Sequence, residues 1–280
     1  MSEKIFNPLK HPVCLEFPLW LEETAWAGHI PFAMFITSAF RPRVFVELGT
    51  FRGASYCAFC QAVKSVKTKT KCFAVDTWQG DAHAGQIERE VLVKLKAYHD
   101  LLYGDFSRLV ESTFDDALDD FADGSIDLLH IDGFHTYEAV RHDFETWQPK
   151  MSKRGIVLFH DTTVRERDFG VWKFWDEVKE NRPHFEFSHA HGLGVLFVGE
   201  DLPEELQLLF AADENQTAVI RSFFNALGER VEWPRHYQTQ SERVEELQKY
   251  ETIVKNSRLI QKYHALRKDG LGSLLKKPIG

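Results

Sequence analysis

Two apolar runs in this sequence each end in a carboxylate and an imidazole. The run Ile-Asp-Leu-Leu-His-Ile leads into Asp132 and His135, and the run Ile-Val-Leu-Phe leads into His160 and Asp161. The carboxyl ends of adjacent parallel strands lie side by side, so we expect these four side chains to converge at one crevice. Two carboxylates with one or two imidazoles suit a divalent metal, Mg²⁺ or Mn²⁺ if oxygen ligands dominate and Fe²⁺ if both histidines bind. The alternative is that the aspartates cap helices and the histidines are buried core residues.

A second group of residues suggests a nucleoside-type cofactor. The earliest apolar run ends in Glu47-Leu-Gly49-Thr-Phe-Arg-Gly53, whose glycines permit a tight turn and a close approach of a ligand to the following helix. The spacing differs from Gly-x-Gly-x-x-Gly, so the dinucleotide fingerprint is not met. Asp76 ends the next apolar run, where a carboxylate can accept both hydroxyls of a ribose. A plain turn and a helix N-cap are the competing interpretation of these residues.

These side chains must be positioned by an alternation of strands and helices. Strands are predicted at Val44–Leu48, Cys72–Asp76, Arg108–Ser112, Ile126–Ile131, Ile156–His160, Phe185–Ser188 and Val195–Val198. Helices are predicted at Ser55–Val66, Ile87–Leu102, Asp115–Ala122, Tyr137–Trp147 and Val171–Glu180. Such alternation predicts an α/β fold with a parallel sheet covered on both faces. The last two strands are joined by six residues, too few for a crossover, and should form an antiparallel hairpin.

Composition and charge narrow the class of protein. The chain has 280 residues and a formal net charge of −8, which argues against binding of nucleic acid through its phosphates. Four irregularly spaced cysteines do not form a disulfide scaffold and fit a reducing compartment. No apolar stretch is long enough to span a bilayer. We therefore expect a cytoplasmic protein without an integral membrane segment.

The chain after the hairpin has a different character. Residues 201–238 contain two short helical patterns, and residues 240–267 run without Gly or Pro and carry apolar residues three and four positions apart. This spacing predicts a helix with an apolar stripe, but its heptads are too poor for a firm coiled coil. Because so polar a helix is not stable alone, we expect it to pack on another copy, a partner or a further domain.

The ordered motifs resemble those of the class I S-adenosylmethionine-dependent methyltransferases. Within this class, the motifs resemble those of the metal-dependent O-methyltransferase branch, which includes macrolide-sugar methyltransferases and cephalosporin-hydroxylase-like proteins. It rests on four segments: Glu47-x-Gly49-x-x-x-Gly53, Asp76-Thr-Trp-x-Gly-Asp81, Ile131-Asp132-Gly133-x-His135-x-Tyr137 and His160-Asp161-Thr162. It covers about residues 20–200. It implies a Rossmann-like, doubly wound, seven-stranded sheet with a C-terminal antiparallel β-hairpin, followed by a helical extension.

The resemblance also implies a division of the chain. Residues 1–200 would form the methyltransferase domain, with a helical lead-in over 1–42, residues 201–238 a helical extension, and residues 239–280 a helical, coiled-coil-type tail.

The resemblance implies roles for individual residues. Those expected to contact S-adenosylmethionine are Gly49 and Gly53 at its methionine portion with Glu47 nearby, Asp76 at the ribose, and Thr113 and Phe114 at the adenine. Those expected to hold a divalent metal, Mg²⁺ or Mn²⁺, are Asp132, Asp161 and His160, although some relatives carry a carboxylate in place of His160. His135 falls where related enzymes carry the general base. Asp81, His189 and His191 are the expected substrate contacts.

The function implied is a metal-assisted O-methyltransferase acting on a sugar or glycan hydroxyl, in bacterial surface-glycan or glycoside biosynthesis. Domains of this type also occur fused ahead of glycosyltransferases, so the C-terminal helix would serve a homo-oligomer or a larger glycan-assembly protein. Two alternatives remain. One is an Fe²⁺-dependent oxygenase using His135, Asp132 and His160. The other is a non-catalytic module that uses the methyltransferase fold to oligomerise.

Overall fold

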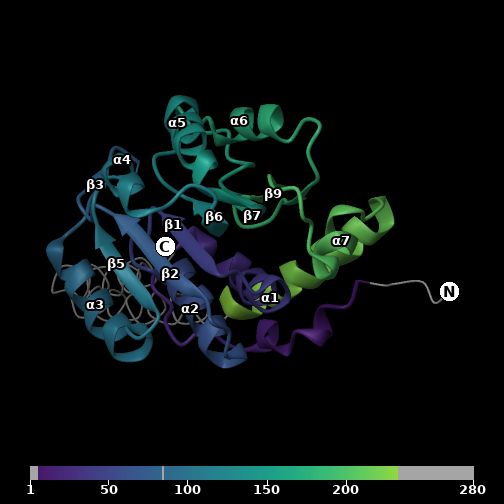
Figure 1. Cartoon of the computed structure of the whole chain (residues 1–280), viewed down its shortest axis with the longest axis horizontal. Helices are drawn as coiled ribbons and strands as arrows, with labels where there is room; N and C mark the ends of the chain where they lie inside the picture. Colours follow the sequence, from purple (N-terminus) through teal and green to yellow (C-terminus); the bar gives the residue numbers. More distant parts are fainter. Residues whose placement is uncertain (1–5, 84, 233–280) are drawn as a thin grey trace, which may run out of the picture. The chain divides into compact units, whose positions relative to one another are not determined.

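A seven-stranded sheet forms the centre of the computed structural model, which describes residues 6–83 and 85–232 (Figure 1). Its strand order is β5-β2-β1-β6-β7-β9-β8. The first five of these are parallel to one another, and β9 runs antiparallel to both β7 and β8. The strands are β1 (Val44–Leu48), β2 (Lys71–Asp76), β5 (Ser107–Glu111), β6 (Ile126–Ile131), β7 (Met151–His160), β8 (His184–Phe187) and β9 (Leu193–Phe197). The predicted α/β fold with its terminal hairpin is confirmed.

Helices cover both faces of the sheet. They are α1 (Ile30–Phe40), α2 (Ala54–Val66), α3 (Arg89–Tyr103), α4 (Phe114–Ala117), α5 (Tyr137–Trp147), α6 (Val171–Val178) and α7 (Glu204–Phe210), and residues 214–232 are also helical. A two-residue ladder pairs β3 (Gly80–Asp81) with β4 (Gly85–Gln86). Phe45 points to the face covered by α1 and α2, whereas its neighbour Val46 points to the face covered by α5 and α6. This alternation along a buried strand gives the molecule two apolar layers, one on each face.

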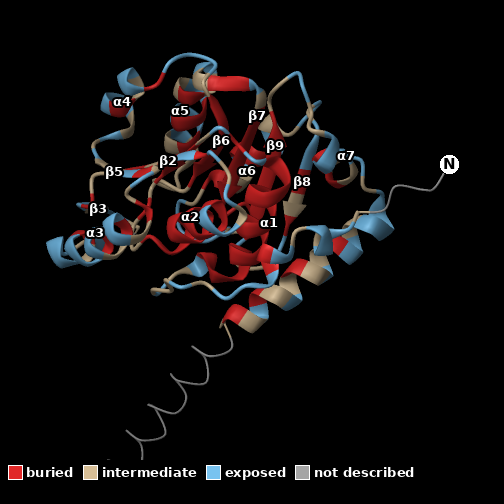
Figure 2. Ribbon diagram, turned by 60° about the horizontal axis from the view of Figure 1, so that its bottom comes forward, coloured by how far each residue is buried: buried red, intermediate tan, exposed pale blue. Residues whose placement is uncertain are grey.

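The helix α1 lies wholly inside one of these layers. All eleven of its residues are buried, in keeping with a segment that is apolar all round (Figure 2). The helical residues 214–232 pack against it, with the ring of Phe224 5.3 Å from those of both Phe32 and Phe35. As far as Val231 this helix forms one compact unit with the sheet. The predicted tail at 239–280 lies outside the described residues. Within the described part of the chain, no helix is long and apolar enough to cross a membrane.

Among the strands and helices predicted above, two differ from those observed by more than two residues at one end, and the others agree to within two residues. The strand expected to begin at Ile156 begins at Met151, because an irregularity in the pairing with β6 lets the polar segment before Ile156 join the sheet. The helix expected over Asp115–Ala122 is the short α4, whose N-cap Thr113 accepts a hydrogen bond from the backbone N–H of Asp116, followed by a 3₁₀ turn.

The amino ends of β1, β6 and β7 are joined by the buried carboxylate of Asp127. Its oxygens accept hydrogen bonds from the Arg43 backbone N–H and guanidinium at 2.7–2.9 Å and from Ser152 Oγ at 2.6 Å. Burial raises the pKa of Asp127, but the hydrogen bonds from Arg43 and Ser152 outweigh it, so the pKa lies below its usual value. The carboxylate is therefore stabilised in its charged form.

We expect Asp127→Ala to lower the free energy of unfolding by about 1.5–3 kcal/mol, the contribution of hydrogen bonds to a charged group. Asp127 contributes most above the pKa of an unfolded aspartate, and its contribution is lost as the pH falls through the folded value. Urea denaturation at pH 7 and pH 3 measures both effects. Asp123→Ala, at an exposed ion pair with Lys150, is the control and should cost less than about 1 kcal/mol. Equal losses for the two variants would contradict the prediction.

Candidate active site

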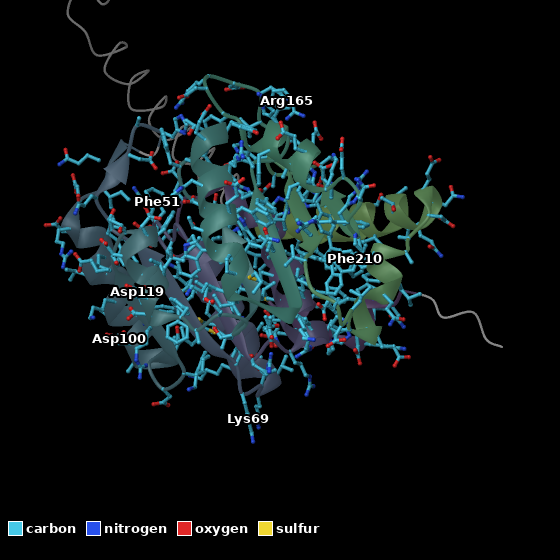
Figure 3. All side chains as sticks on the ribbon, turned by 45° about the horizontal axis from the view of Figure 1, so that its top comes forward. Phe51, Lys69, Asp100, Asp119, Arg165 and Phe210 are labelled. Carbon is cyan, nitrogen blue, oxygen red and sulfur yellow. The ribbon has the colours of Figure 1, made fainter. Side chains whose placement is uncertain are left out.

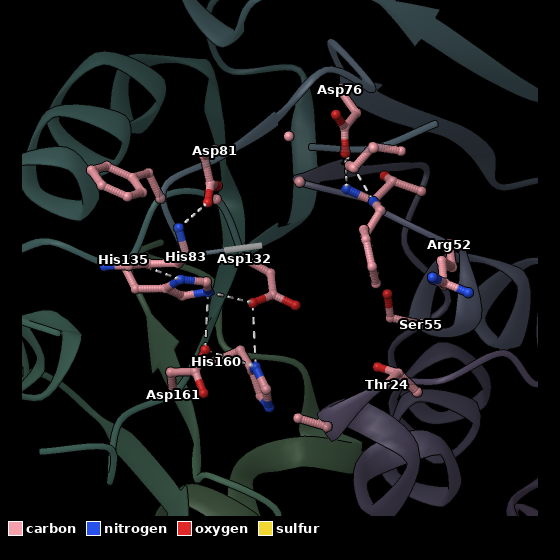
Figure 4. Close-up of a pocket in the computed structure, with 18 of the residues that line it drawn as sticks. Thr24, Arg52, Ser55, Asp76, Asp81, His83, Asp132, His135, His160 and Asp161 are labelled. Carbon is pink, nitrogen blue, oxygen red and sulfur yellow. Dashed lines mark hydrogen bonds and ion pairs between the residues drawn. The ribbon is translucent and has the colours of Figure 1, made fainter. Parts of the chain in front are cut away.

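A cavity of about 500 Å³ opens at the carboxyl ends of the parallel strands (Figure 4). The strand order reverses at β1, whose neighbours are β2 and β6, and ligands of doubly wound sheets bind at such a reversal. The predicted site residues that line the cavity are Gly49, Asp76, Asp81, Thr113, Phe114, Asp132, His135, His160, Asp161 and His191. Glu47, Gly53 and His189 are outside the lining that the described residues form. Figure 3 labels Phe51, which lies in the loop at the carboxyl ends of the strands, where the cavity opens. It also labels Lys69, which lies just before the amino end of β2, on the opposite side of the sheet.

The four residues at the ends of β6 and β7 converge. His135 Nε2 lies 3.0 Å from Asp161 Oδ2 and 3.6 Å from Asp132 Oδ1. His160 Nδ1 lies 3.2 Å from Asp132 Oδ1 and 3.3 Å from Asp161 Oδ2. Asp161 adopts the left-handed backbone conformation, φ 62°, immediately after β7. Such a conformation is costly for a residue other than glycine and is found where the surrounding structure imposes it, often at functional sites.

The charged side chains of this cluster shift one another's pKa values. Burial lowers the pKa of His135, but its hydrogen bonds to Asp132 and Asp161 outweigh burial and raise the pKa to about 9. His160 is more deeply buried, and the two carboxylates likewise raise its pKa above the usual value. Burial raises the pKa of both aspartates, and the neighbouring imidazoles more than reverse that effect. At neutral pH the two aspartates are therefore ionised, and in the absence of another cation the histidines carry protons.

The hydrogen bonds behind His160 show that the cluster suits a metal cation. His160 Nε2 lies 3.1 Å from the carbonyl oxygen of Ala190, which can only accept, so we assign the Nε2 proton to that bond. Neutral His160 then directs the lone pair of Nδ1 at two carboxylates. A lone pair facing two anions is unfavourable unless a proton or a metal cation lies between them. The ligand atoms of Asp132, His135 and Asp161 lie within 4.8 Å of one another, so His135 is also within ligand reach. A divalent cation with mixed nitrogen and oxygen ligands fits this donor set.

The loop of residues 49–53, called the glycine loop below, approaches the backbone of Asp132 closely. Gly49 has φ +84°, and a Cβ on it would lie 2.1 Å from the carbonyl oxygen of Asp132, so only glycine permits this approach. Gly53 precedes α2 and packs against Leu95 rather than lining the cavity.

Asp76 holds this loop in place. Its Oδ2 accepts hydrogen bonds from the backbone N–H groups of Thr50 and Phe51, both at 2.8 Å, and its Oδ1 accepts from the N–H of Trp78 at 2.6 Å (Figure 4). Asp76 lines the cavity, as expected for a residue at the ribose. Its established contacts, however, are to the loop. Only Oδ1 retains acceptor capacity for a ligand hydroxyl without displacing one of these bonds.

Glu47 belongs to a buried chain beneath the cavity. The indole N–H of Trp26 donates to His130 Nε2 at 3.1 Å, so His130 Nδ1 carries the proton and donates to Glu47 Oε2 at 2.8 Å. Both Glu47 and His130 are fully buried, and burial raises the pKa of the Glu47 carboxyl. This chain connects β1, β6 and the 3₁₀ turn before α1, and it supports the floor of the site.

The two predicted substrate histidines of the β8–β9 turn occupy different places. His191 Nδ1 lies 3.1 Å from Asp161 Oδ1, and its side chain is 57% exposed at the rim of the cavity. His189 turns away, with Nε2 3.3 Å from the carbonyl oxygen of Gly28 and its ring 4.6 Å from that of His29.

Several residues of the site come from loops that sequence reasoning did not single out. Phe169 stacks on the ring of His135 with a centroid distance of 4.7 Å and an interplanar angle of 5°. Arg52 and Arg167 also line the cavity. His83, two residues after Asp81, lines the cavity as well. Arg167 and Phe169 follow β7 by a few residues, as ligand-contacting residues of such folds do, but no motif distinguishes them.

Comparison with known proteins finds a family that matches most of the segment lining this cavity. Residues 46–162 match a family described as a methyltransferase domain. The match begins inside β1 and ends one residue after Asp161, so it includes the glycine loop, Asp76 and all four residues of the convergent cluster.

The chain also resembles individual proteins. The chain is 49% identical over 214 residues to the uncharacterized protein y4gI of Sinorhizobium fredii, a match that covers 76% of this chain. The chain spans 22% of the length of that relative. Among solved structures it is similar to the S-adenosylhomocysteine-bound methyltransferase PaMTH1 of Podospora anserina, with a TM-score of 0.47, 14% identity and coverage of 60% of this chain and 77% of the other. The O-methyltransferase TomG of Streptomyces achromogenes gives a TM-score of 0.46, 12% identity and coverage of 65% and 92%.

Proposed function

We propose that this methyltransferase domain transfers the methyl group of S-adenosylmethionine to a hydroxyl oxygen with the help of a divalent metal. The observation that carries the proposal is that one cavity is lined both by the glycine loop, whose Gly49 lies against the backbone of Asp132, and by the side chains of Asp132, His135 and Asp161. A sulfonium cofactor held at the loop would lie beside a base and a cation site.

The residues present account for the chemistry that such a transfer requires. The acceptor oxygen attacks the sulfonium methyl carbon, the new C–O bond forms as the C–S bond breaks, and the hydroxyl proton passes to His135 Nε2. The reaction is an in-line displacement, so positioning of the two reactants supplies much of the rate. Asp132 and Asp161, with His160 behind them, would hold the metal, which when bound lowers the pKa of a coordinated hydroxyl. The stacked ring of Phe169 fixes the plane of His135.

We propose a sugar or glycan hydroxyl as the acceptor, in bacterial surface-glycan or glycoside biosynthesis. The cavity mouth supports this choice because it combines hydrogen-bonding groups with ring faces. Asp81, His191 and Arg167 offer acceptors and donors to hydroxyls, and Phe134 and Phe169 offer apolar faces. Such a mixture suits a molecule that is polar at its edges and apolar on its faces.

One observation favours a second candidate, an Fe²⁺-dependent oxygenase. Both His135 and His160 reach the carboxylate oxygens of Asp132 and Asp161, as a two-histidine, one-carboxylate site requires. The glycine loop has no role in that chemistry. Oxygen consumption by the iron-loaded protein without S-adenosylmethionine would favour the oxygenase.

Calorimetric titration of S-adenosylhomocysteine into metal-stripped protein, repeated with Mg²⁺ or Mn²⁺, tests the proposal. We expect micromolar binding, weakened in Asp76→Ala because the loop that Asp76 holds would lose its anchor. Asp120→Ala, an exposed aspartate after α4, is the matched control and should bind normally. If no titration gives heat of binding while the protein is folded by circular dichroism, the methyltransferase proposal is wrong.

A further inference from the structure

Behind His135, on the side away from the carboxylates, lies a pair of residues that the proposed mechanism does not use. His83 Nδ1 is 3.3 Å from His135 Nδ1, and His83 Nε2 is 2.7 Å from Asp168 Oδ1. The three residues come from separate segments: the β3–β4 connection, the loop after β6, and the loop between β7 and α6. The His83 side chain is only 4% exposed, whereas that of Asp168 is 66% exposed. The result is a carboxylate–imidazole–imidazole chain that runs from solvent to the cavity (Figure 4 shows its inner bond).

The hydrogen bonds that link Asp168, His83 and His135 all run in one direction, because only some of the atoms involved can donate. An ionised carboxylate only accepts, so His83 Nε2 carries the proton that faces Asp168. The hydrogen bond from His83 lowers the pKa of Asp168, in keeping with this assignment. Neutral His83 then has an unprotonated Nδ1, which accepts from the Nδ1–H of His135. His135 Nε2 lies 3.0 Å from Asp161 Oδ2 and faces the carboxylates and the cavity, so without a metal it carries a proton toward them. With a cation bound between the carboxylates, a neutral His135 that donates its Nδ1 proton to His83 leaves Nε2 unprotonated.

The loop that supplies Asp168 also fixes the position of His135. The Gly170 N–H donates to the His135 carbonyl oxygen at 2.8 Å. A Cβ on Gly170 would lie 2.3 Å from the backbone nitrogen of Tyr137, so glycine is needed for the approach. Phe169 stacks on His135 and, at 4.5 Å and 21°, on His83 as well. The two imidazoles therefore share one aromatic support and one hydrogen bond.

We propose that Asp168 and His83 are positioning residues that hold His135 with Nδ1 protonated and Nε2 free to accept the proton of the acceptor hydroxyl. The inference rests on the proposed role of His135 as the base. A ring nitrogen can act as a base only if its lone pair, not its proton, faces the substrate, and the bond to the other nitrogen decides which is present. Outer partners that fix the tautomer of a metal-ligating histidine typically contribute roughly 10–100-fold to metal affinity or activity, and we expect a loss of this order here.

The tautomer can be measured without an acceptor, which separates this inference from the proposed function. Full-length protein labelled with ¹⁵N in its histidines is examined by long-range ¹H–¹⁵N correlation at alkaline pH, at which the His135 ring is neutral, with and without Mg²⁺. A spectrum of His135→Asn identifies the His135 signals. With Mg²⁺ bound, we expect the Nδ1–H tautomer of His135 in the unaltered protein and a mixture of tautomers in His83→Ala. Without Mg²⁺, we expect a proton on His135 Nε2 in both proteins, because that atom faces two ionised carboxylates.

Three variants in the exposed loop complete the test. Asp168→Ala should shift the tautomer balance in the same direction as His83→Ala, and Asp168→Asn should restore it because the amide oxygen still accepts from His83. Glu166→Ala removes an exposed acidic residue of the same loop and should leave the signals unchanged. Because Asp168 is largely exposed, its variants should fold normally.

Two results with Mg²⁺ bound would overturn the inference: an Nε2–H tautomer of His135 in the unaltered protein, or an unchanged tautomer in both His83→Ala and Asp168→Ala. Once turnover is measured, His83→Ala should lower kcat roughly 10–100-fold with little change in KM. If His135 has the expected Nδ1–H tautomer but the protein transfers no methyl group, the result counts against the proposed function. The positioning of His135 by His83 and Asp168 would still stand.

Discussion

Replacing His135 with alanine is expected to slow methyl transfer from S-adenosylmethionine by roughly 10²–10⁴-fold, the contribution of a positioned general base. The affinity for S-adenosylhomocysteine should stay nearly unchanged, because His135 faces the carboxylates and the aromatic support rather than the glycine loop. Formation of S-adenosylhomocysteine with a panel of monosaccharide glycosides as acceptors measures the first quantity, and calorimetry measures the second.

A matched control for this variant is His142→Ala. His142 lies on the exposed side of α5, paired with Asp115, and its loss removes an imidazole without touching the cavity. Turnover should be unaffected. If His135→Ala keeps its rate with any acceptor that the unaltered protein methylates, His135 is not the base and the proton must leave by another route.

The second large effect is expected for Asp161→Asn, which keeps the shape of the side chain and removes its charge. We expect the affinity for Mn²⁺ to fall by more than the roughly 10–100-fold that loss of an outer partner of a metal site costs, because Asp161 would be a ligand itself. Calorimetry or electron paramagnetic resonance of Mn²⁺ measures the affinity. Asp176→Asn, at an exposed ion pair on α6, should bind as the unaltered protein does.

The same titration should depend on pH in a defined direction. In the metal-free protein the charges of Asp132 and Asp161 hold the pKa of His135 at about 9, so a bound cation and the His135 proton compete for the same carboxylates. Metal binding should therefore release protons at pH 7, and the affinity should rise as the pH rises toward about 9. An affinity independent of pH in this range, or equal in Asp161→Asn, would exclude the cluster as the metal site.

The sequence alone predicted most of the framework, because the relevant signals are local. The strands Val44–Leu48 and Ile126–Ile131 and the helix Tyr137–Trp147 have the predicted bounds. The two strands are apolar nearly throughout, and the helix begins after Thr136, whose side chain accepts a hydrogen bond from the Ala139 N–H. Strand order in a doubly wound sheet then brings the ends of β6 and β7 together. For this reason the sequence is sufficient to assign Asp132, His135, His160 and Asp161 to one site.

Other features of the site depend on where loops meet after folding. Asp76 was expected at a ribose, and its carboxylate is also the anchor of the loop at Thr50 and Phe51. His189 and His191 are two residues apart in one turn, but positive φ at Ala190 and His191 sends one toward Gly28 and the other to the cavity rim. Neither outcome can be inferred from spacing, because a single residue in the left-handed conformation redirects the chain.

The order of the buried strands and the chemistry at their ends can be predicted from the amino-acid sequence, because burial and periodicity are properties of neighbouring residues. The hydrogen-bond partners behind His135 are known only from the folded protein, because His83 lies 52 residues before His135 and Asp168 lies 85 residues after His83. Hydrogen bonds between distant loops leave no periodic pattern in a sequence, because they form only when the sheet has fixed both loops at the same edge.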